Sequence, residues 1–298
     1  MDDASAVIAK KLEEARTLIE LRIEEIAAGL KGLGLDEVVS YISKGGKRLR
    51  GFLSIITCEA LGGRAEDAVD TAVATELVHS ASLALDDIVD QDVVRRGSPS
   101  AWVLFGIGKT AMISLFLVPL ALKLVERYGR VALGYSIQAW EETVRGEIAD
   151  AYPSADGSYD YLEVARLKTG SLFSLAAALG AVAASRPGKA EEAYRYGGLI
   201  GLSYQVADDL VDYLLYLGGE RRKLDPSERL FERWVKESLG GKQEDDLTAR
   251  VLNFLRERTT EASMAAESLF PQGPYQEVMK YLPRFIVNSM LVRKGLSI

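Results

Sequence analysis

Cysteine and histidine are almost absent from this sequence, with one residue of each. The single cysteine, Cys58, excludes an intrachain disulfide, and its apolar neighbours on both sides predict a buried thiol. Since nitrogen and sulfur ligands are scarce, a metal site in this chain would have to rely on carboxylate oxygens, which suit hard cations such as Mg²⁺.

Long apolar runs, a basic surplus and low-complexity tracts are also lacking. The longest apolar stretch, Ala111–Leu122, is too short to span a bilayer, contains Pro119 and ends at Lys123. The N-terminal segment is acidic and shows no basic start before an apolar run, so a signal peptide is not expected. With a net charge of −7 and interleaved signs, the chain is not expected to bind nucleic acid. We therefore expect a soluble, cytoplasmic protein without a transmembrane segment.

Helical periodicity dominates the sequence. Between residues 4 and 30, apolar residues recur every three or four positions with charges between them, and strand-like alternation is hard to find. Breaks that contain glycine or proline divide the chain into helix-sized pieces, and none is long enough for an interdomain linker. Apolar residues make up 48 % of the chain, which is enough for a sizeable core. We predict an all-α fold with a single domain over residues 1–298, a bundle of about ten or more helices.

Two nearly identical aspartate motifs carry the first chemical signal, DDIVD beginning at Asp86 and DDLVD beginning at Asp208. On a helix, Asp86 and Asp90 share one face a turn apart, and Asp208 and Asp212 repeat this spacing. A solvated acidic face is the plain alternative. Because the neighbouring residues are apolar, clustered carboxylates there would be costly without a cation. Two such pairs facing each other predict a cluster of Mg²⁺ ions around a diphosphate.

Basic residues follow a double glycine and the first aspartate motif. Lys47 and Arg50 lie three residues apart after Gly45-Gly46, at the expected start of an apolar helix, and helix N-termini favour anions. A capped, solvated helix start is the alternative. Arg95 and Arg96 come directly after the first aspartate motif, where they could bind phosphate in a bidentate manner.

Four more polar residues lie beside these motifs or at the mouth of an apolar helix. His79 precedes Asp86 by seven residues, about two turns, and so shares its helix face. A structural histidine is the alternative. Lys168 and Thr169 begin an almost wholly apolar helix, and Gln205 lies one turn before the second aspartate motif.

These motifs occur in a fixed order between Lys44 and Asp212: GGKRLR, H-x6-DDxxD, RRG, KTG and YQxxDDxxD. In this order they resemble the trans-isoprenyl diphosphate synthases, the polyprenyl synthetase family, and in particular its geranylgeranyl diphosphate synthases. The segment Val144–Asp150 is also similar to the family's Gly-Gln-x-x-Asp motif. The resemblance implies the isoprenoid synthase fold, with helices around a central cavity. It also implies Mg²⁺-dependent transfer of an allylic prenyl group to isopentenyl diphosphate, and a homodimer.

The resemblance further implies a role for each matched residue. The implied ligands of three Mg²⁺ ions on the allylic diphosphate are Asp86, Asp90 and Asp208. Arg95 would contact the same diphosphate, and the residues implied to bind isopentenyl diphosphate are Lys47, Arg50, His79 and Arg96. The catalytic candidates, implied to flank the allylic cation and its leaving group, are Lys168, Thr169 and Gln205. The released diphosphate is the implied base.

Three departures from the family pattern are visible. The usual Gly-Asp pair is missing at residues 112–115, and Leu85 stands where histidine is frequent. After the second motif, GGERRKLDPSERLF replaces the usual Gly-Lys segment, so Arg222 is our candidate for the missing lysine, with Arg221 and Lys223 as alternatives. These departures favour one alternative function, a weakly active or regulatory subunit of a heteromer. A terpene cyclase is less favoured, because it would have no use for an isopentenyl diphosphate pocket.

Small residues precede the first aspartate motif, and they bear on product length. In the family, a large side chain four or five residues before the first aspartate stops elongation early, and here these positions hold Ser82 and Ala81. We therefore predict a product of geranylgeranyl length or longer. The candidate side chains that would end the cavity further along are Leu77, Val78, Met112 and Phe116.

Overall fold

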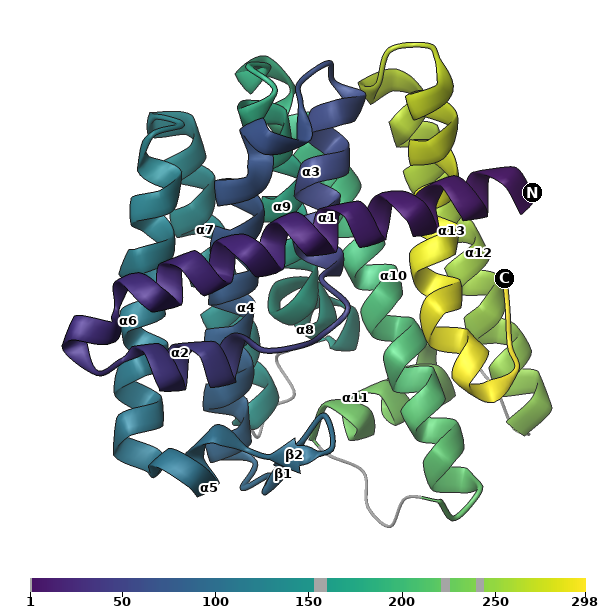
Figure 1. Ribbon diagram of the computed structural model, residues 1–298. Coiled ribbons are helices and arrows are strands. Elements are labelled where there is room, and N and C mark those ends of the chain that lie inside the picture. Colours follow the sequence, from purple (N-terminus) through teal and green to yellow (C-terminus); the bar gives the residue numbers. More distant parts are fainter. Residues whose placement is uncertain (1, 153–159, 221–225, 240–243) are drawn as a thin grey trace. The chain divides into compact units, whose positions relative to one another are not determined.

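Helices make up nearly all of the described chain (Figure 1). The computed structural model describes residues 2–152, 160–220, 226–239 and 244–298. Within these ranges, the one sheet is a hairpin of two strands with two residues each. The predicted all-α fold is therefore confirmed.

The chain divides into two compact units. Unit 1 comprises Met1–Ala6, Glu141–Ser174 and Tyr194–Ile298, and unit 2 comprises Val7–Trp140 and Leu175–Ala193. Each unit contains fully buried apolar side chains, for example Phe231 in unit 1 and Phe52 in unit 2. The single domain expected over residues 1–298 stays a prediction.

Most of the elements before residue 130 are helices. In chain order they are α1 (Asp2–Gly29), η1 (Lys31–Leu33), α2 (Asp36–Ser43), α3 (Leu49–Ala60), η2 (Ala65–Ala68), α4 (Val69–Val89), β1 (Val94–Arg95), β2 (Ser98–Pro99), α5 (Ala101–Phe105) and α6 (Ile107–Glu126). The elements from residue 130 on are α7 (Arg130–Ala151), α8 (Tyr161–Ala165), η3 (Arg166–Gly170), α9 (Ser171–Ala183), η4 (Pro187–Lys189), α10 (Ala190–Leu217), α11 (Pro226–Trp234), η5 (Val235–Leu239), α12 (Glu244–Leu269), α13 (Pro274–Leu291) and η6 (Val292–Lys294).

Helix α4 of unit 2 is largely buried, and it packs against α3 and α6 (Figure 1). Buried hydroxyl groups of α4 donate to carbonyls of the same helix or of the turn before it. The Thr71 hydroxyl lies 2.8 Å from the Ala68 oxygen, and the Thr75 hydroxyl lies 2.9 Å from the Thr71 oxygen. Because these polar groups are satisfied internally, α4 can be surrounded by other helices up to its C-terminal end, where the first aspartate motif lies.

The β1–β2 hairpin directly follows this motif. Its two turn residues, Arg96 and Gly97, have φ angles of 53° and 74°, as in a type I′ turn, which favours glycine at the second position. The pairing of Val94 with Pro99 and of Arg95 with Ser98 closes the turn. The hairpin, which sequence periodicity missed because its strands are so short, fixes the directions of Arg95 and Arg96.

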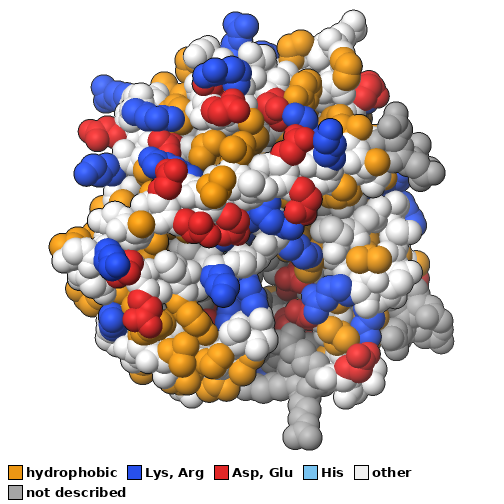
Figure 2. All heavy atoms as spheres, in the orientation of Figure 1, with side chains coloured by type: hydrophobic (Ala, Val, Ile, Leu, Met, Phe, Trp, Pro, Cys, Tyr) orange, Lys and Arg blue, Asp and Glu red, His pale blue; other side chains and the backbone are white. Residues whose placement is uncertain are grey.

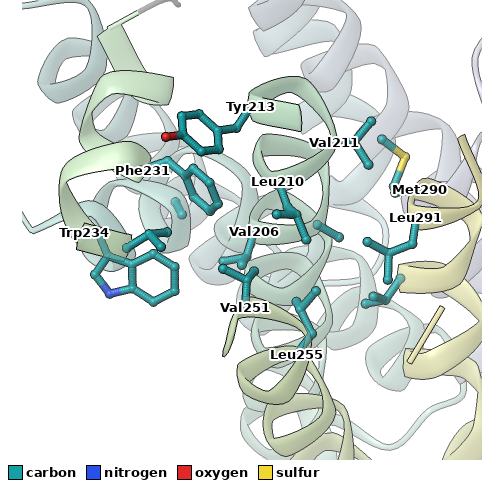
Figure 3. Packing of buried hydrophobic residues seen from close by; sticks show 14 of the residues in the cluster. Val206, Leu210, Val211, Tyr213, Phe231, Trp234, Val251, Leu255, Met290 and Leu291 are labelled. Carbon is teal, nitrogen blue, oxygen red and sulfur yellow. The ribbon is translucent and has the colours of Figure 1, made fainter. Parts of the chain in front are cut away.

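Unit 1 is built around a buried apolar cluster (Figure 3). In Figure 3, Val206, Leu210 and Val211 of α10 extend toward neighbouring helices, with Phe231 and Trp234 of the α11 region on one side and Met290 and Leu291 of α13 on the other. Most of these side chains are completely buried, and burial of each contributes roughly 1.5–3 kcal/mol. The cluster thus holds the helix of the second aspartate motif against the end of α13.

Helix α6 is apolar over most of its length but largely exposed in the single chain. Its length and composition would suffice for a membrane crossing, and 28 % of its most apolar 18-residue stretch is buried. A core helix of a soluble protein can be equally long and apolar, so the expectation of no transmembrane segment stays a prediction. Over the face shown in Figure 2, basic and acidic side chains are interleaved. Apolar side chains gather there near α5 and the hairpin, where Val93, Val94 and Leu104 are exposed.

Candidate active site

In unit 2, the Gly45-Gly46 turn lies against the side chain of Arg96. Arg96 Nη1 donates to the Lys44 carbonyl oxygen at 2.9 Å. Gly46 has a φ of 93°, and a Cβ there would come within 2.9 Å of Arg96 Nη2. The positive φ angle favours glycine at this position, and the missing Cβ leaves room for the guanidinium group. The double glycine therefore brings the guanidinium group and the loop before α3 together.

A pocket of about 320 Å³ opens beside this contact. The residues that line it are Tyr41, Ile42, Lys44, Gly45, Gly46, Ser80, Leu83, Ala84, Asp87, Arg95, Arg96, Ser98, Pro99 and Ala101. Two guanidinium groups and a glycine-rich loop in one pocket are a suitable environment for a phosphate or diphosphate group.

Arg95 pairs with Asp87, the middle aspartate of the first motif. Arg95 Nε lies 2.7 Å from Asp87 Oδ1, and Nη2 also contacts that oxygen. Asp87 is buried, whereas Asp86 is partly exposed and Asp90 exposed. Carboxylates at a helix C-terminus are disfavoured by the helix dipole, so the arginine offsets one of three negative charges at this end of α4. Sequence reasoning missed this partner, because the residues are joined only by the hairpin.

A buried arginine fixes the start of α3, between Lys47 and Arg50 in the sequence, two of the four residues predicted to bind isopentenyl diphosphate. Arg48 is 2 % exposed, and its guanidinium lies 2.8 Å from Glu20 of α1 and 3.4 Å from Glu76 of α4. Glu76 also accepts the backbone N–H of Gly51 at 2.8 Å. Breaking such a buried network by removing one partner costs several kcal/mol. Arg48 therefore positions the turn that carries Lys47.

The single histidine contacts a predicted site residue. Arg50 Nη1 lies 3.1 Å from His79 Nε2. Burial, followed by the positive charges of Arg50 and Arg96, holds the pKa of His79 well below its ordinary value. The imidazole is therefore neutral at pH 7, and since a guanidinium can only donate, Nε2 accepts this hydrogen bond.

The first aspartate motif suits a metal of the Mg²⁺ type. Asp86 and Asp90 lie one turn apart at the end of α4, and the Asp90 N–H donates to the Asp86 carbonyl at 2.8 Å. In the part of the chain that the structure describes, no group of three or more His, Cys, Asp or Glu side chains is arranged to hold a metal by itself. Mg²⁺ typically uses one or two carboxylates together with waters and substrate phosphates, so a carboxylate pair beside a diphosphate pocket fits this ion.

In unit 1, Lys168 lies between two carboxylates of α7. Lys168 Nζ is 2.8 Å from Glu147 Oε2 and 2.7 Å from Asp150 Oδ2. The lysine sits in the π-helical turn η3, a feature that is frequent at functional sites. Gly146 allows this turn to approach α7, because its missing Cβ leaves room for the Lys168 backbone. Glu147 and Asp150 belong to the segment that sequence analysis compared with the Gly-Gln-x-x-Asp motif.

A hydrogen-bonded chain connects two of the predicted catalytic residues with two that sequence reasoning missed. The Thr169 hydroxyl donates to Gln205 Oε1 at 2.6 Å, and Gln205 Nε2 donates to Asp209 Oδ1 at 3.0 Å. The Tyr161 hydroxyl donates to Asp209 Oδ2 at 2.6 Å. Burial raises the pKa of Asp209 well above its ordinary value, although both donors act against this. The middle aspartate of the second motif is thus a buried acceptor that fixes Gln205.

The outer aspartates of the second motif lie near the C-terminal end of α13. Asp208 Oδ1 is 3.6 Å from Arg293 Nη1, and Asp212 Oδ1 is 3.9 Å from Arg293 Nη2. Arg293 lies 81 residues beyond Asp212 and in no motif, so the sequence pattern gave no sign of this contact. Arg222, the residue proposed for the missing lysine, falls outside the described residues, as do Arg221 and Lys223.

An apolar cavity of about 220 Å³ lies in unit 2, away from the polar pocket. Its lining residues are Ala74, Val78, Val118, Ala121, Leu122, Val125, Ser136, Ile137, Trp140, Leu175 and Leu179. Of the four residues predicted to end a product cavity, Val78 lines this one. Met112 does not line it: this residue is 66 % exposed and lies about 120° around α6 from Val118. Leu77 and Phe116 are also not among its lining residues.

Comparison with known proteins decides the family. The sequence model of the polyprenyl synthetase family matches residues 34–216. This chain belongs to the polyprenyl synthetase family. The hexaprenyl pyrophosphate synthase of Saccharolobus solfataricus is 36 % identical over 279 residues, which cover 93 % of this chain and 94 % of that protein.

Two further polyprenyl synthetases support this assignment over nearly the whole chain. The geranylfarnesyl diphosphate synthase of Methanosarcina mazei is 26 % identical over 92 % of each chain. The structure of a geranylgeranyl pyrophosphate synthetase from Geoglobus acetivorans is similar with a TM-score of 0.75 at 25 % identity, and the match covers 93 % of this chain and 99 % of that one. The resemblance read from the motifs is therefore confirmed, and with it the fold.

The polyprenyl synthetase motifs of this chain are distributed over both units. Unit 2 brings together Arg50 with His79 and places Arg95 and Arg96 in one pocket. Unit 1 brings Thr169 and Gln205 together, while Lys168 instead contacts two carboxylates. The individual roles of these residues stay predictions.

Proposed function

We propose that this polyprenyl synthetase condenses isopentenyl diphosphate head-to-tail with an allylic diphosphate. The observation that carries the proposal is the polar pocket of unit 2, where two arginines and a double-glycine loop adjoin the aspartate-bearing end of α4. A terpene cyclase would have no use for a pocket that binds isopentenyl diphosphate. The hexaprenyl and geranylfarnesyl names of the relatives support a product of geranylgeranyl length or longer.

In this proposal, the cationic side chains of unit 2 hold the diphosphate oxygens of the two substrates. Arg96 and Arg50 bind isopentenyl diphosphate with Lys47, while the neutral His79 keeps the Arg50 guanidinium in place. Arg95 contacts the allylic diphosphate. Lys168 and Thr169 flank the allylic group, and Gln205 is held in place by the buried Asp209.

We further propose that three Mg²⁺ ions are bound through Asp86, Asp90 and Asp208. When bound, the ions supply positive charge against the negative charge that develops on the leaving diphosphate. The condensation then needs a proton acceptor, and the released diphosphate fills this role because no side chain among the matched residues is an evident base.

The test is a product assay with purified protein, Mg²⁺, isopentenyl diphosphate and primers of several lengths. Release of diphosphate and formation of prenyl diphosphates of at least geranylgeranyl length are expected. A protein that binds both substrates but releases no diphosphate would instead be the regulatory subunit of a heteromer. Conversion of an allylic diphosphate alone into a cyclic hydrocarbon would identify a cyclase.

We also propose a homodimer that covers part of α6. The exposed stripe of this helix contains Met112 and Leu115, which are 66 % and 57 % exposed, with Pro119 one turn further. Such a row of exposed apolar residues is typical of a surface covered by a partner. Light scattering should then show a particle of twice the 32.5 kDa chain mass, and Met112→Lys with Leu115→Lys should reduce it to a monomer. A monomeric wild-type protein would contradict the proposal.

A further inference from the structure

The helical turn η6 is held close to α10, the helix that carries the second aspartate motif, by contacts on both sides of Arg293. Leu291, completely buried, packs in the same apolar cluster as Val211 of α10 (Figure 3). Lys294 Nζ lies 2.6 Å from Glu220 Oε1, just beyond the end of α10. Arg293, between these two attachments, is therefore held next to the motif by the fold.

The guanidinium group of Arg293 faces both outer aspartates of the second motif. Its two terminal nitrogens lie 3.6 Å from Asp208 Oδ1 and 3.9 Å from Asp212 Oδ1, one nitrogen toward each carboxylate. The side chain is 49 % exposed, so it has room to change its rotamer. At these distances, the contacts are weak ion pairs and not close hydrogen bonds, and the guanidinium keeps donors for another anion.

Metal binding by the same carboxylates would change the balance of charge around Arg293. A divalent ion held by Asp208 would repel the guanidinium, since both are positive. A diphosphate bound beside that ion would present oxygens to the same side chain. Arginine then gains charge-assisted, bidentate hydrogen bonds that it does not make with the carboxylates.

We propose that Arg293 is a diphosphate-binding residue at the second aspartate motif. In the absence of metal, it partly neutralises Asp208 and Asp212, and with metal and diphosphate bound, it contacts the diphosphate. The inference rests on the proposed function. Arg293 would supply a cation at the second aspartate motif, which is not followed by the family's usual Gly-Lys segment. It assigns this role to a residue outside every recognised motif.

The test uses the full chain, inorganic diphosphate and two variants that each remove one positive charge. Arg293→Gln removes the proposed contact, and Lys294→Gln is the matched control, because the neighbouring lysine points to Glu220 instead. Calorimetric titration with diphosphate at saturating Mg²⁺ should show binding weakened about tenfold or more in Arg293→Gln and less than threefold in Lys294→Gln. Arg293→Lys should recover part of the loss.

A second measurement separates a ligand-binding role from a structural one. Without diphosphate, Mn²⁺ binding followed by electron paramagnetic resonance should be equal or tighter in Arg293→Gln, because a competing cation has been removed. Equal diphosphate affinity in wild type and Arg293→Gln would overturn the inference while leaving the proposed function intact. Weakened Mn²⁺ binding in Arg293→Gln would also overturn it, since the residue would then only shape the site. A wild-type protein that binds no diphosphate with Mg²⁺ would overturn both.

Discussion

Gly146 of α7 lies directly against the backbone of Lys168: a Cβ at position 146 would come within 2.3 Å of the Lys168 nitrogen and 2.7 Å of its Cα. The contact joins the helix that contributes Glu147 and Asp150 to the π-helical turn that carries the lysine. Because both approaching atoms belong to the backbone, no side-chain rotation can relieve the overlap. The position of Lys168 therefore depends on the absence of a Cβ at residue 146.

Replacing Gly146 with alanine should displace this turn. Overpacking of a rigid contact costs about 1–3 kcal/mol, so we expect a lower melting temperature and at least a tenfold loss of turnover. Gly134→Ala in the same helix is the control, since a Cβ there has no atom within 4 Å and alanine favours a helix by up to about 1 kcal/mol. Equal melting temperatures for the two variants would show that the contact does not constrain the turn.

The metal ligands give the second prediction. Asp86→Ala and Asp208→Ala should each raise the barrier by several kcal/mol, which is a loss of turnover of roughly 10²-fold or more, and chelation of Mg²⁺ should abolish turnover. Circular dichroism should show the helices unchanged. Asp246→Ala, at an exposed aspartate of α12, serves as the control and should remain active. Near-wild-type turnover of Asp86→Ala at saturating Mg²⁺ would contradict the assignment.

Much of the fold and part of the site could be read from the sequence, because both have short-range signatures. The spacing of Asp86 and Asp90 identifies a shared helix face, and the apolar periodicity identifies the helices. The partners of the middle aspartates could not be read, because Arg95 reaches Asp87 through a hairpin too short to show periodicity. Asp209 meets Tyr161 across 48 residues of chain.

The third prediction concerns the single thiol. Cys58 is completely buried, as its apolar neighbours predicted, and burial, with Asp67 and Glu59 adding to it, raises its pKa to about 12. An unfolded chain loses this proton near pH 9 and the folded chain does not. The thiol therefore contributes stability below about pH 9, and this contribution is lost as the pH rises toward 12.

Unfolding by urea at several pH values measures this effect. Between pH 9 and 12, the free energy of unfolding of wild type should fall faster than that of Cys58→Ala, by up to about 1.4 kcal/mol per pH unit. A thiol reagent at pH 8 should modify the unfolded protein quickly and the native protein hardly at all. Parallel pH dependences for the two proteins would show that the folded thiol titrates normally.

Product length provides the last prediction, and the apolar cavity of unit 2 supplies the geometry. Val78 and Ala74 line this cavity on α4, eight and twelve residues before Asp86. At 1.5 Å per residue, they lie about 12 and 18 Å along the helix from the first aspartate. They are about 6 Å apart, roughly the length of one extended isoprene unit. Both positions therefore measure depth along the path that we propose for the growing chain.

Phenylalanine at either position would fill part of the cavity without reaching the aspartates. Val78→Phe should therefore shorten the longest product, and Ala74→Phe should stop elongation about one isoprene unit later, with the first condensation little changed in both. Trp140→Ala, which removes a large ring from the cavity wall of α7, should lengthen the products. Chromatography of the dephosphorylated products gives the distributions. If both phenylalanine variants stop at the same length as wild type, the product does not occupy this cavity. If both stop at the same shorter length, the depth along α4 does not determine product length.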